Sequence, residues 1–434
     1  MPFPTPRAAL LLALGALPAL FAAGSRDAAG AVVAVDLALL ALLVLDGLLT
    51  PERGALAASR GLTEPLSAFA PNRVTLTLES RARRTLRLEL ADAPPPELDS
   101  TGHRRSAKLE PGETLELSYQ ATPRRRGEVA FGDLHIRARG PLGLAFRQWR
   151  VPLAQVASVY PDLRALAAAT GAERAEAGRA RVRHAHEGRE FAGLRPYLPG
   201  DDVRSMDWKA TARRGAPVLR EWEPERDQAV WLLLDCGRLL SARLGDGRTK
   251  LDHAVDAALA LARAAAARGD RAGAVLFGAE VREVVPPSRG RTAMAALATA
   301  LHGAQPRLEA SDFAAAFQAV EAGQRRRGLV LVLTDLDDPD STAPLRAGAA
   351  QLARRHLVRV VAVSDSEVSE VARARPAKEA DAFARAAAEQ ILAEQERAAL
   401  ELAAAGVRVE RVPARELTTA VVRRYLEVKR RGEV

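Results

Sequence analysis

The sequence predicts a membrane-anchored chain that ends in a doubly wound α/β domain with a mostly parallel sheet. Apolar runs at residues 8–23 and 31–49 predict an N-terminal two-helix transmembrane hairpin. Residues 72–159 alternate apolar and polar side chains between Pro/Gly turns, which predicts a small antiparallel β-sandwich. From Ala229 onward, apolar strands alternate with helical segments, one of them expected at Pro344–Arg355, as is typical of a parallel sheet covered on both faces.

These patterns divide the chain into five expected parts. They are a transmembrane hairpin at 1–52, a β-sandwich-like domain at 60–160, a linker at 161–187, a distinctive segment at 188–228 and the α/β domain at 229–434. With 434 residues, the chain is long enough for two or three domains that each bury a core.

The first apolar run has two interpretations. It follows Arg7 and ends in small residues, as a secretory signal peptide does. A second segment of spanning length follows within a few residues, and this favours the hairpin. Arg7, Arg53 and Arg60 flank the hairpin, against Arg26 in its loop. The positive-inside rule then predicts a multi-pass protein of the bacterial inner membrane whose soluble domains face the cytoplasm.

Neither apolar run is an ideal span. The first is short and contains Pro18, and the second carries Asp36 and Asp46. We expect Asp46 to lie near the membrane interface and Asp36 nearer the other end of the segment.

The positive charge of the chain is almost entirely arginine. The net charge is +9, and only five of the 63 basic residues are Lys. In the β-rich region Arg alternates with Leu, which favours a solvated strand face over a nucleic-acid groove. The single Cys236 excludes an intramolecular disulfide and fits a reducing compartment.

The segment Gly188–Leu234 combines charged residues with three of the four Trp. Such side chains must be buried or bound to something, so the segment is either a packed cap or a recognition surface. Asp201 and Asp202 lie between Arg195 and Arg204, and we expect them to form ion pairs that fix the loop rather than a catalytic carboxylate pair.

Acidic residues end two strands of the predicted parallel sheet. Asp235 and Asp335 follow apolar strands, and ligand sites form at this edge of open α/β sheets. With hydroxyls from Thr334 and Ser311 they could bind Mg²⁺ through oxygen ligands. The alternative is that the two Asp are helix N-caps.

Other catalytic patterns are missing from the sequence. Residues 245–250 resemble a phosphate loop only in composition, and no G-x-S-x-G elbow occurs. His184, His186 and Glu187 could suggest a metal cluster, but an HxH in an Arg-rich linker is more often solvated. We therefore expect no enzymatic activity and no cofactor.

The segment from Gly188 closely resembles the signature of the bacterial domain-of-unknown-function family 58. That signature runs approximately G-x-E-F-x-x-L-R-x-Y-x-x-G-D-x-x-R-x-I-x-W-x-x-x-A-R before an apolar strand. The matching positions are Gly188, Glu190, Phe191, Leu194, Arg195, Tyr197, Gly200, Asp201, Arg204, Trp208, Ala212 and Arg213. In this family the segment joins a β-rich region to the α/β domain, and we expect Trp208 and Tyr197 to be buried there while Asp201 and Arg204 hold the loop.

The resemblance implies both a fold and a partner. It implies an N-terminal membrane hairpin, a von Willebrand factor A-like α/β domain and association with a MoxR-type AAA+ ATPase. The chain is accordingly expected to be a membrane-anchored adaptor with a chaperone-like or envelope-related role. The alternatives are an Arg-rich nucleic-acid-binding protein and a hydrolase of envelope polymers.

The von Willebrand factor A fold also implies a metal site of the form D-x-S-x-S with a distant Thr and Asp. Asp235 and Asp335 match its acids, and Ser311 stands for the Thr. Gly237 and Leu239 replace both Ser residues. This departure argues against the binding of Mg²⁺.

Overall fold

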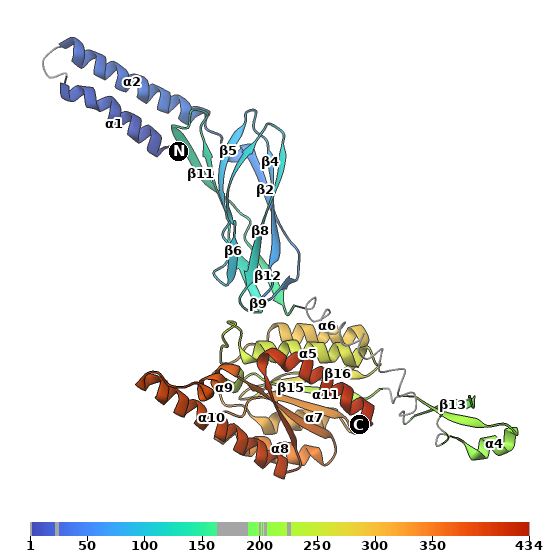
Figure 1. Ribbon diagram of the computed structural model, residues 1–434. Helices are drawn as coiled ribbons and strands as arrows, with labels where there is room; N and C mark the ends of the chain where they lie inside the picture. The colour runs from blue at the N-terminus through green and yellow to red at the C-terminus, as the bar shows by residue number, and fades with distance from the viewer. Residues whose placement is uncertain are drawn as a thin grey trace. The chain divides into compact units, whose positions relative to one another are not determined.

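The structure, a computed structural model, describes residues 2–21, 26–162, 190–198, 201, 203, 206–223 and 227–433. It divides into two compact units, Met1–Tyr160 and Pro161–Val434. Figure 1 shows the elements of both. Apart from its first two residues, the expected linker 161–187 lies outside the described residues.

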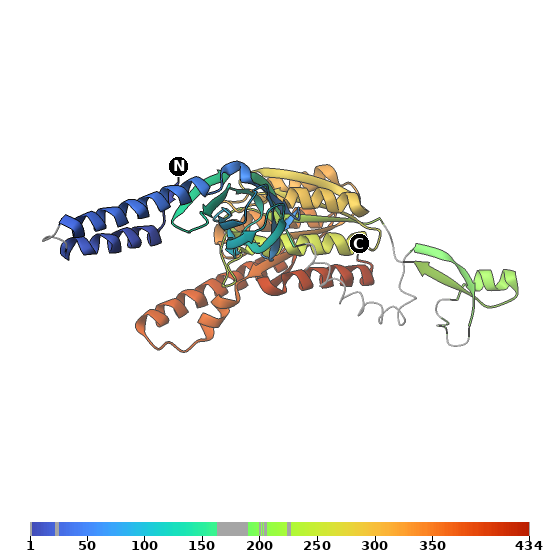
Figure 2. The ribbon, with the colours of Figure 1, turned by 90° about the horizontal axis from the view of Figure 1, so that it is seen from above.

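The first unit begins with a short strand and two helices. These are β1 Phe3–Pro4, α1 Pro6–Phe21 and α2 Arg26–Leu49, and the helices run side by side (Figures 1 and 2). Among the described residues, Val32–Leu49 is the one stretch long and apolar enough to cross a membrane, and such a helix can be an anchor or a signal sequence. With 16 residues, α1 reaches only about 24 Å, less than the hydrocarbon core of a bilayer. The expectation of two full spans is therefore not supported.

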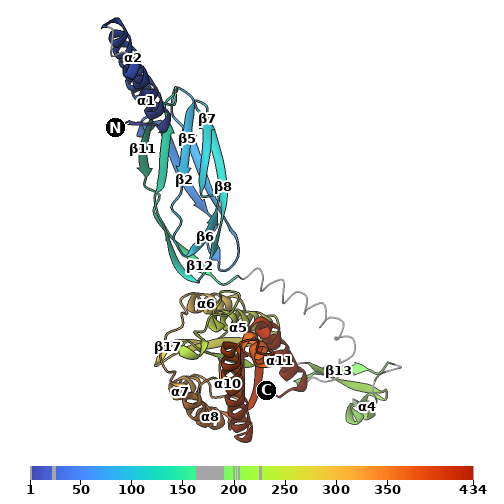
Figure 3. The same ribbon diagram turned by 60° about the vertical axis from the view of Figure 1, so that its left-hand side comes forward.

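Two larger antiparallel sheets follow in the same unit (Figure 3). The strands are β2 Leu56–Leu62, β3 Leu66–Ser67, β4 Asn72–Ser80, β5 Leu86–Ala91, β6 Leu98–Thr101, β7 Arg104–Leu109, β8 Thr114–Pro123, β9 Gly127–Phe131, β10 Leu134–Arg139, β11 Ala145–Val151 and β12 Gln155–Tyr160. One sheet has the order β1-β11-β10-β5-β7 and the other β2-β4-β8-β6, with a small third sheet β3-β12-β9. Alternate residues such as Leu76, Leu88 and Ile136 enter one shared core, as the period-two pattern predicts.

A buried ion pair lies inside this β-domain. The side chains of Arg60 and Asp92 are fully buried, and Arg60 Nε donates to Asp92 Oδ2 at 3.0 Å. Tyr119 Oη donates to the same oxygen at 2.6 Å, and burial, with the Asp92 carboxylate, raises the pKa of Tyr119. Arg60, which the sequence analysis counted among the basic residues flanking the hairpin, is therefore buried in the β-domain.

The second unit opens with a small hairpin and a short helix. β13 Glu190–Pro196 pairs with β14 Val218–Glu223, and α4 Trp208–Arg214 lies between them in the chain. We call these described residues the signature hairpin.

A six-stranded sheet forms the α/β domain. Its strands are β15 Ala229–Asp235, β16 Arg271–Phe277, β17 Val281–Arg289, β18 Leu329–Thr334, β19 Leu357–Ser364 and β20 Arg408–Pro413. The order is β17-β16-β15-β18-β19-β20, and every pair is parallel except β16 with β17. This confirms the predicted mostly parallel sheet. β15 is buried along its whole length, because helices cover both faces.

The helices of this domain lie between and beside the strands. They are α5 Lys250–Ala266, α6 Gly290–His302, α7 Phe313–Gly323, α8 Pro339–Ala353, α9 Ser366–Arg373, α10 Glu379–Ala404 and α11 Leu417–Arg431, with short 3-10 turns η1 Arg53–Ala55, η3 Arg238–Leu240 and η4 Ala414–Glu416 elsewhere in the chain. Residues of α7, α8 and α10 pack with Trp231 and Leu233 in one core. α5 packs against α6 and α11 (Figure 1).

One helix begins earlier than its sequence suggests. The helix expected at Pro344–Arg355 starts at Pro339, because Asp338 caps it through the N–H of Asp340 and Pro339 fits the first helical turn. Pro344 then lies inside the helix rather than at its start.

We predict that Arg60→Met lowers the free energy of unfolding by about 3–5 kcal/mol, because it leaves the Asp92 carboxylate buried without its cation. Arg73→Met is the matched control, since Arg73 is 69% exposed and lies 3.8 Å from Glu116. It should change stability by about 0.5 kcal/mol or less. Denaturant unfolding in detergent measures both, and equal losses would contradict the prediction.

Candidate functional site

The predicted site residues lie at the carboxyl edge of the six-stranded sheet. Asp235 ends β15, Asp335 follows the neighbouring strand β18, and Ser311 lies in the loop before α7. β15 pairs with β16 on one side and with β18 on the other, so the strand order reverses at β15. Ligands bind at such a switch point in open α/β sheets.

Asp235 is surrounded by donors from this protein. It is fully buried, and its Oδ1 accepts from Ser311 Oγ at 2.5 Å and from the N–H of Gly237 at 2.8 Å. Its Oδ2 accepts from Thr334 Oγ1 at 2.6 Å. Burial raises the pKa of Asp235, although these hydrogen bonds oppose the rise. The structure therefore brings Asp235 and Ser311 together, but in direct contact with each other.

Asp335 is paired with a lysine that the sequence analysis did not select. Lys250, the first residue of α5, donates through Nζ to Asp335 Oδ2 and, at 3.0 Å, to Asp337 Oδ2. The side chains of Lys250 and Asp335 are 4% and 1% exposed. Gln395 Nε2 donates to the other oxygen of Asp337. We call Asp235, Ser311, Lys250 and Asp335, with these partners, the edge cluster.

Burial and pairing shift the protonation of this ion pair. Burial disfavours the charged form of Lys250, but the carboxylates of Asp335 and Asp337 outweigh it and raise the lysine pKa. Burial also raises the pKa of Asp335 to about 7. The scarcity of Lys in the sequence was the signal that could have found Lys250, since it is one of only five.

The edge cluster does not fit the metal site that the resemblance implies. Lys250 supplies the positive charge that a divalent cation would supply to Asp335. A Cβ on Gly237 would lie 2.1 Å from Ser311 Oγ, so a serine could not stand there without displacing Ser311. Among the residues that the structure describes, no group of three or more His, Cys, Asp or Glu could hold a metal.

Asp235 and Asp335 are not helix caps either. The helices that follow them, α5 and α8, are capped by Thr249 and Asp338, whose side chains accept from backbone N–H groups of these helices. The two predicted site carboxylates instead form the polar interior of the sheet edge, which leaves both alternatives of the sequence analysis unsupported.

The signature hairpin contains one of the expected ion pairs. Arg195 binds Asp201 through two hydrogen bonds, Nη1 to Oδ2 at 2.6 Å and Nη2 to Oδ1 at 2.7 Å. The N–H of Leu198 also donates to Asp201 Oδ2, at 2.9 Å. This bidentate geometry confirms that Arg195 and Asp201 fix the loop after β13.

The expectation that Trp208 is buried was wrong. Trp208 is 66% exposed, while Tyr197 is half-buried. Trp208 begins α4, a seven-residue helix with no buried residue, and Asp207 caps this helix through the N–H of Ala210 at 2.9 Å. So short a helix buries too little area to cover an indole.

Several predicted residues fall outside the described part of the chain. Gly188, Gly200, Asp202, Arg204 and the group His184, His186 and Glu187 are among them, and only the strand position of Glu190 is described. Arg213 lies exposed in the last turn of α4.

A comparison with protein-family models finds a match that includes part of the signature hairpin and most of the six-stranded sheet. Residues 193–382 match the family model "Protein of unknown function DUF58". The DUF58 match begins within β13 and ends within α10, so it includes α4 and the strands and loops that build the edge cluster.

Uncharacterized bacterial proteins also match part of this chain. Rv1480 of Mycobacterium tuberculosis is 36% identical over 186 residues, which are 41% of this chain and 56% of that protein. YeaD of Bacillus subtilis is 30% identical over 124 residues, 28% of this chain and 31% of that protein. The chain thus spans about half the length of the first of these relatives.

Two solved structures show a distant likeness to parts of this chain. BatB from Bacteroides thetaiotaomicron is 15% identical with a TM-score of 0.34, over 48% of this chain and 100% of that one. A FixG-related protein from Vibrio parahaemolyticus is 12% identical with a TM-score of 0.19, over 25% of this chain and 98% of that one. Scores this low carry no argument about the fold.

We predict that Lys250→Met lowers the free energy of unfolding by about 3–5 kcal/mol, because Asp335 stays buried without its cation. Lys209→Met, at an exposed position of α4, is the control and should be nearly neutral.

The folded-state pKa of Asp335 lies above its ordinary value, so protonation favours the folded form as pH falls through about 7. The loss should therefore be smaller at about pH 5 than at about pH 8, and a pH-independent loss would contradict this account.

We also predict that millimolar Mg²⁺ leaves the melting temperature of the wild-type protein unchanged. A ligand that binds only the folded state would raise it, and here Lys250 already balances the carboxylates. A rise that a chelator reverses, and that Asp335→Asn abolishes, would contradict this prediction.

Proposed function

We propose that this chain is a non-enzymatic, membrane-anchored binding protein whose signature hairpin docks on a cytoplasmic protein partner. The observation that carries the proposal is the exposure of Trp208 on a capped, ion-paired hairpin. Large exposed aromatic side chains held in place by local bonds are typical of binding hot spots.

Other side chains of the hairpin suit a protein partner as well. Leu198 and Val203 are 61% and 53% exposed, and together with Trp208 they offer apolar surface. Lys209, Arg213 and Arg214 are exposed on α4. A partner with an acidic, partly apolar surface fits this combination.

The resemblance to family 58 implies a MoxR-type AAA+ ATPase as that partner. The match over residues 193–382 supports the family part of this inference, and the partner is our proposal. In this view the chain would serve as an adaptor in a chaperone-like or envelope-related task, while the ATPase supplies the chemical energy.

The closed edge cluster supports the non-enzymatic part of the proposal. Asp235, Thr334 and Asp335 are each at most 2% exposed, and their side chains bond to one another, to Lys250, to Ser311 or to backbone N–H groups. A substrate could not reach these groups without opening the cluster. Parallel strands with helices on both faces also support a von Willebrand factor A-like assignment for the domain.

The N-terminal helices support anchorage in the bacterial inner membrane. The window Val32–Leu49 of α2 has the length and composition of a span, and we propose that α1 enters the bilayer beside it. Arg7 and Arg53 at the outer ends of the hairpin are exposed, which supports placing the soluble domains in the cytoplasm.

The arginines of the β-domain support a structural role over nucleic-acid binding. Arg125 lies 2.9 Å from Glu97, and Arg147 lies 2.8 Å from Glu52. Arginines paired in this way are partly neutralised and bind phosphate less well than free ones.

We predict that Trp208→Ala weakens binding to a purified MoxR-type AAA+ ATPase of the same bacterium by at least about 30-fold, the loss expected of a hot-spot residue. Phe383→Ala is the matched control, because Phe383 is 71% exposed on α10 and should change affinity by less than about threefold. Binding would be measured with the full chain in nanodiscs.

The two variants separate the possible outcomes. An equal loss for both would contradict docking through the hairpin. No binding by the wild type would remove the ATPase as the partner, and binding that weakens strongly with salt to DNA or RNA would favour the nucleic-acid alternative.

A further inference from the structure

The last turn of α2 carries a buried carboxylate that holds a turn of the β-domain. Asp46 is 0% exposed, and its oxygens accept hydrogen bonds from the backbone N–H groups of Leu142, Leu144 and Ala145, each at 2.7 Å. Converging N–H groups form an anion-binding nest, and hydrogen bonds to a charged acceptor are about twice as strong as neutral ones. α2 is thereby fixed to the loop between β10 and β11, which we call the 140–145 turn.

The 140–145 turn is shaped to receive this side chain. A Cβ on Gly140 would lie 2.5 Å from the Asp46 carboxylate, so only glycine leaves the necessary space. Gly143 adopts a φ of 73°, which favours glycine and aims the neighbouring N–H groups inward. Thr50 Oγ1 donates to the carbonyl of Asp46 at 2.7 Å and fixes the end of the helix.

The start of α1 is tied to the same turn. Thr5, just before α1, donates through Oγ1 to the carbonyl of Gly143 and through its N–H to the carbonyl of Leu144, both at 2.8 Å. Phe3 in β1 pairs with β11 and stacks on Phe146 at 5.7 Å between ring centroids. Both helices are therefore joined to the β-domain at one place, without a free linker.

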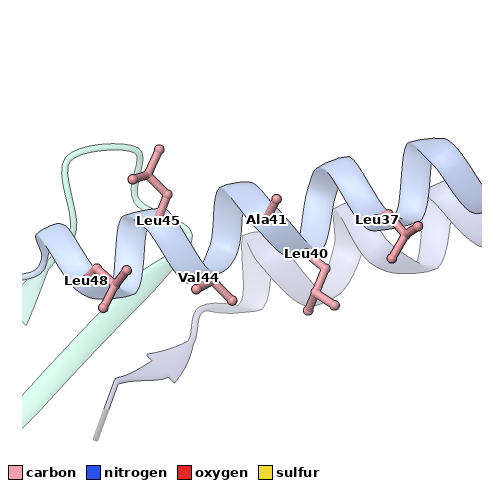
Figure 4. Close-up of a pocket in the computed structure, with 6 residues that line it drawn as sticks. All are labelled: Leu37, Leu40, Ala41, Val44, Leu45 and Leu48. Carbon is pink, nitrogen blue, oxygen red and sulfur yellow. The ribbon is translucent and has the colours of Figure 1, made fainter.

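The exposed face of α2 indicates what surrounds it. Figure 4 shows an apolar stripe along this helix, formed by Leu37, Leu40, Ala41, Val44, Leu45 and Leu48. The 18-residue window Val32–Leu49 is about 27 Å long, close to the thickness of a bilayer core. When this window spans, Asp46 and the 140–145 turn lie at the bilayer boundary.

Side chains around the turn have the chemistry of that boundary. Leu142 and Phe3 are 52% and 53% exposed, and they place apolar surface beside the end of α2. Arg7 is exposed in the first turn of α1, and Arg53 is exposed in η1, just after α2. Apolar and aromatic residues combined with arginine suit the headgroup region of an anionic membrane.

We infer that the end of the β-domain that carries Phe3 and Leu142 is a lipid-contacting surface, which the Asp46 carboxylate holds against anionic phospholipid headgroups. The inference rests on the proposed membrane anchorage, and it adds that the β-domain has a fixed orientation on the bilayer. The occupant of this surface is lipid rather than a second protein.

The test uses the full chain in vesicles of phosphatidylcholine and phosphatidylglycerol. A fluorophore is attached to Leu142→Cys, or to Val156→Cys as the control, since Val156 is 60% exposed on β12 and Cys236 is buried and takes no label. β12 lies at the other end of the β-domain from the helices (Figures 1 and 3). Lipids spin-labelled near the headgroup should quench the label at position 142 and leave the label at position 156 unquenched.

Two further variants test the clamp itself. Asp46→Ala and Gly140→Ala should each reduce quenching at position 142 and speed amide exchange of Leu144 by about 10- to 100-fold, the effect of losing a charge-assisted bond. Gly54→Ala is the matched control, because a Cβ there meets nothing within 4 Å. It should behave like the wild type.

The outcomes distinguish this inference from the anchorage on which it rests. A chain that does not float with the vesicles would overturn both. A chain that floats while both labels remain unquenched would leave the anchorage standing and overturn the lipid-contacting surface. Should Asp46→Ala fail to fold, the wild-type quenching and the Gly140→Ala variant still decide.

Discussion

The constraint on which this structure depends is the cost of a buried carboxylate. Removing such a charge from water costs several kcal/mol unless donors or a cation meet it. Four aspartates are each at most 3% exposed, and each is compensated by different partners: Asp46, Asp92, Asp235 and Asp335. Three backbone N–H groups donate to Asp46, and an arginine and a tyrosine donate to Asp92. Two hydroxyls and a backbone N–H donate to Asp235, and a lysine pairs with Asp335.

The partners of these carboxylates lie far away in the sequence. Asp46 and Leu144 are 98 positions apart, and Lys250 and Asp335 are 85 apart. Such contacts form only when whole elements have come together, so each one ties two elements in a defined place. The first fixes α2 to the β-domain, and the second fixes the start of α5 beside the end of β18.

The local sequence pattern predicts most strands and helices, because hydrophobic periodicity and capping residues mark them. The mostly parallel sheet follows from such signals. Pro344 misled because proline usually starts a helix, whereas Asp338 and Pro339 give a better cap five residues earlier. The prediction that Trp208 is buried failed because tryptophan prefers burial only on average. The seven-residue helix α4 has no buried residue against which the indole could pack.

The candidate site could be located from sequence but not understood from it. The sequence correctly placed Asp235 and Asp335 at the sheet edge. It gave no other meaning to Gly237 than that a serine of the metal-site pattern is absent. In the structure the space that a side chain at Gly237 would need is filled by the hydroxyl of Ser311, which bonds to Asp235. Lys250 supplies a permanent charge to Asp335. A sheet edge that is closed by its own hydroxyls and ammonium has little left to offer a metal or a carboxylate of a partner. Our proposal therefore places recognition on the signature hairpin, where Trp208 stays exposed.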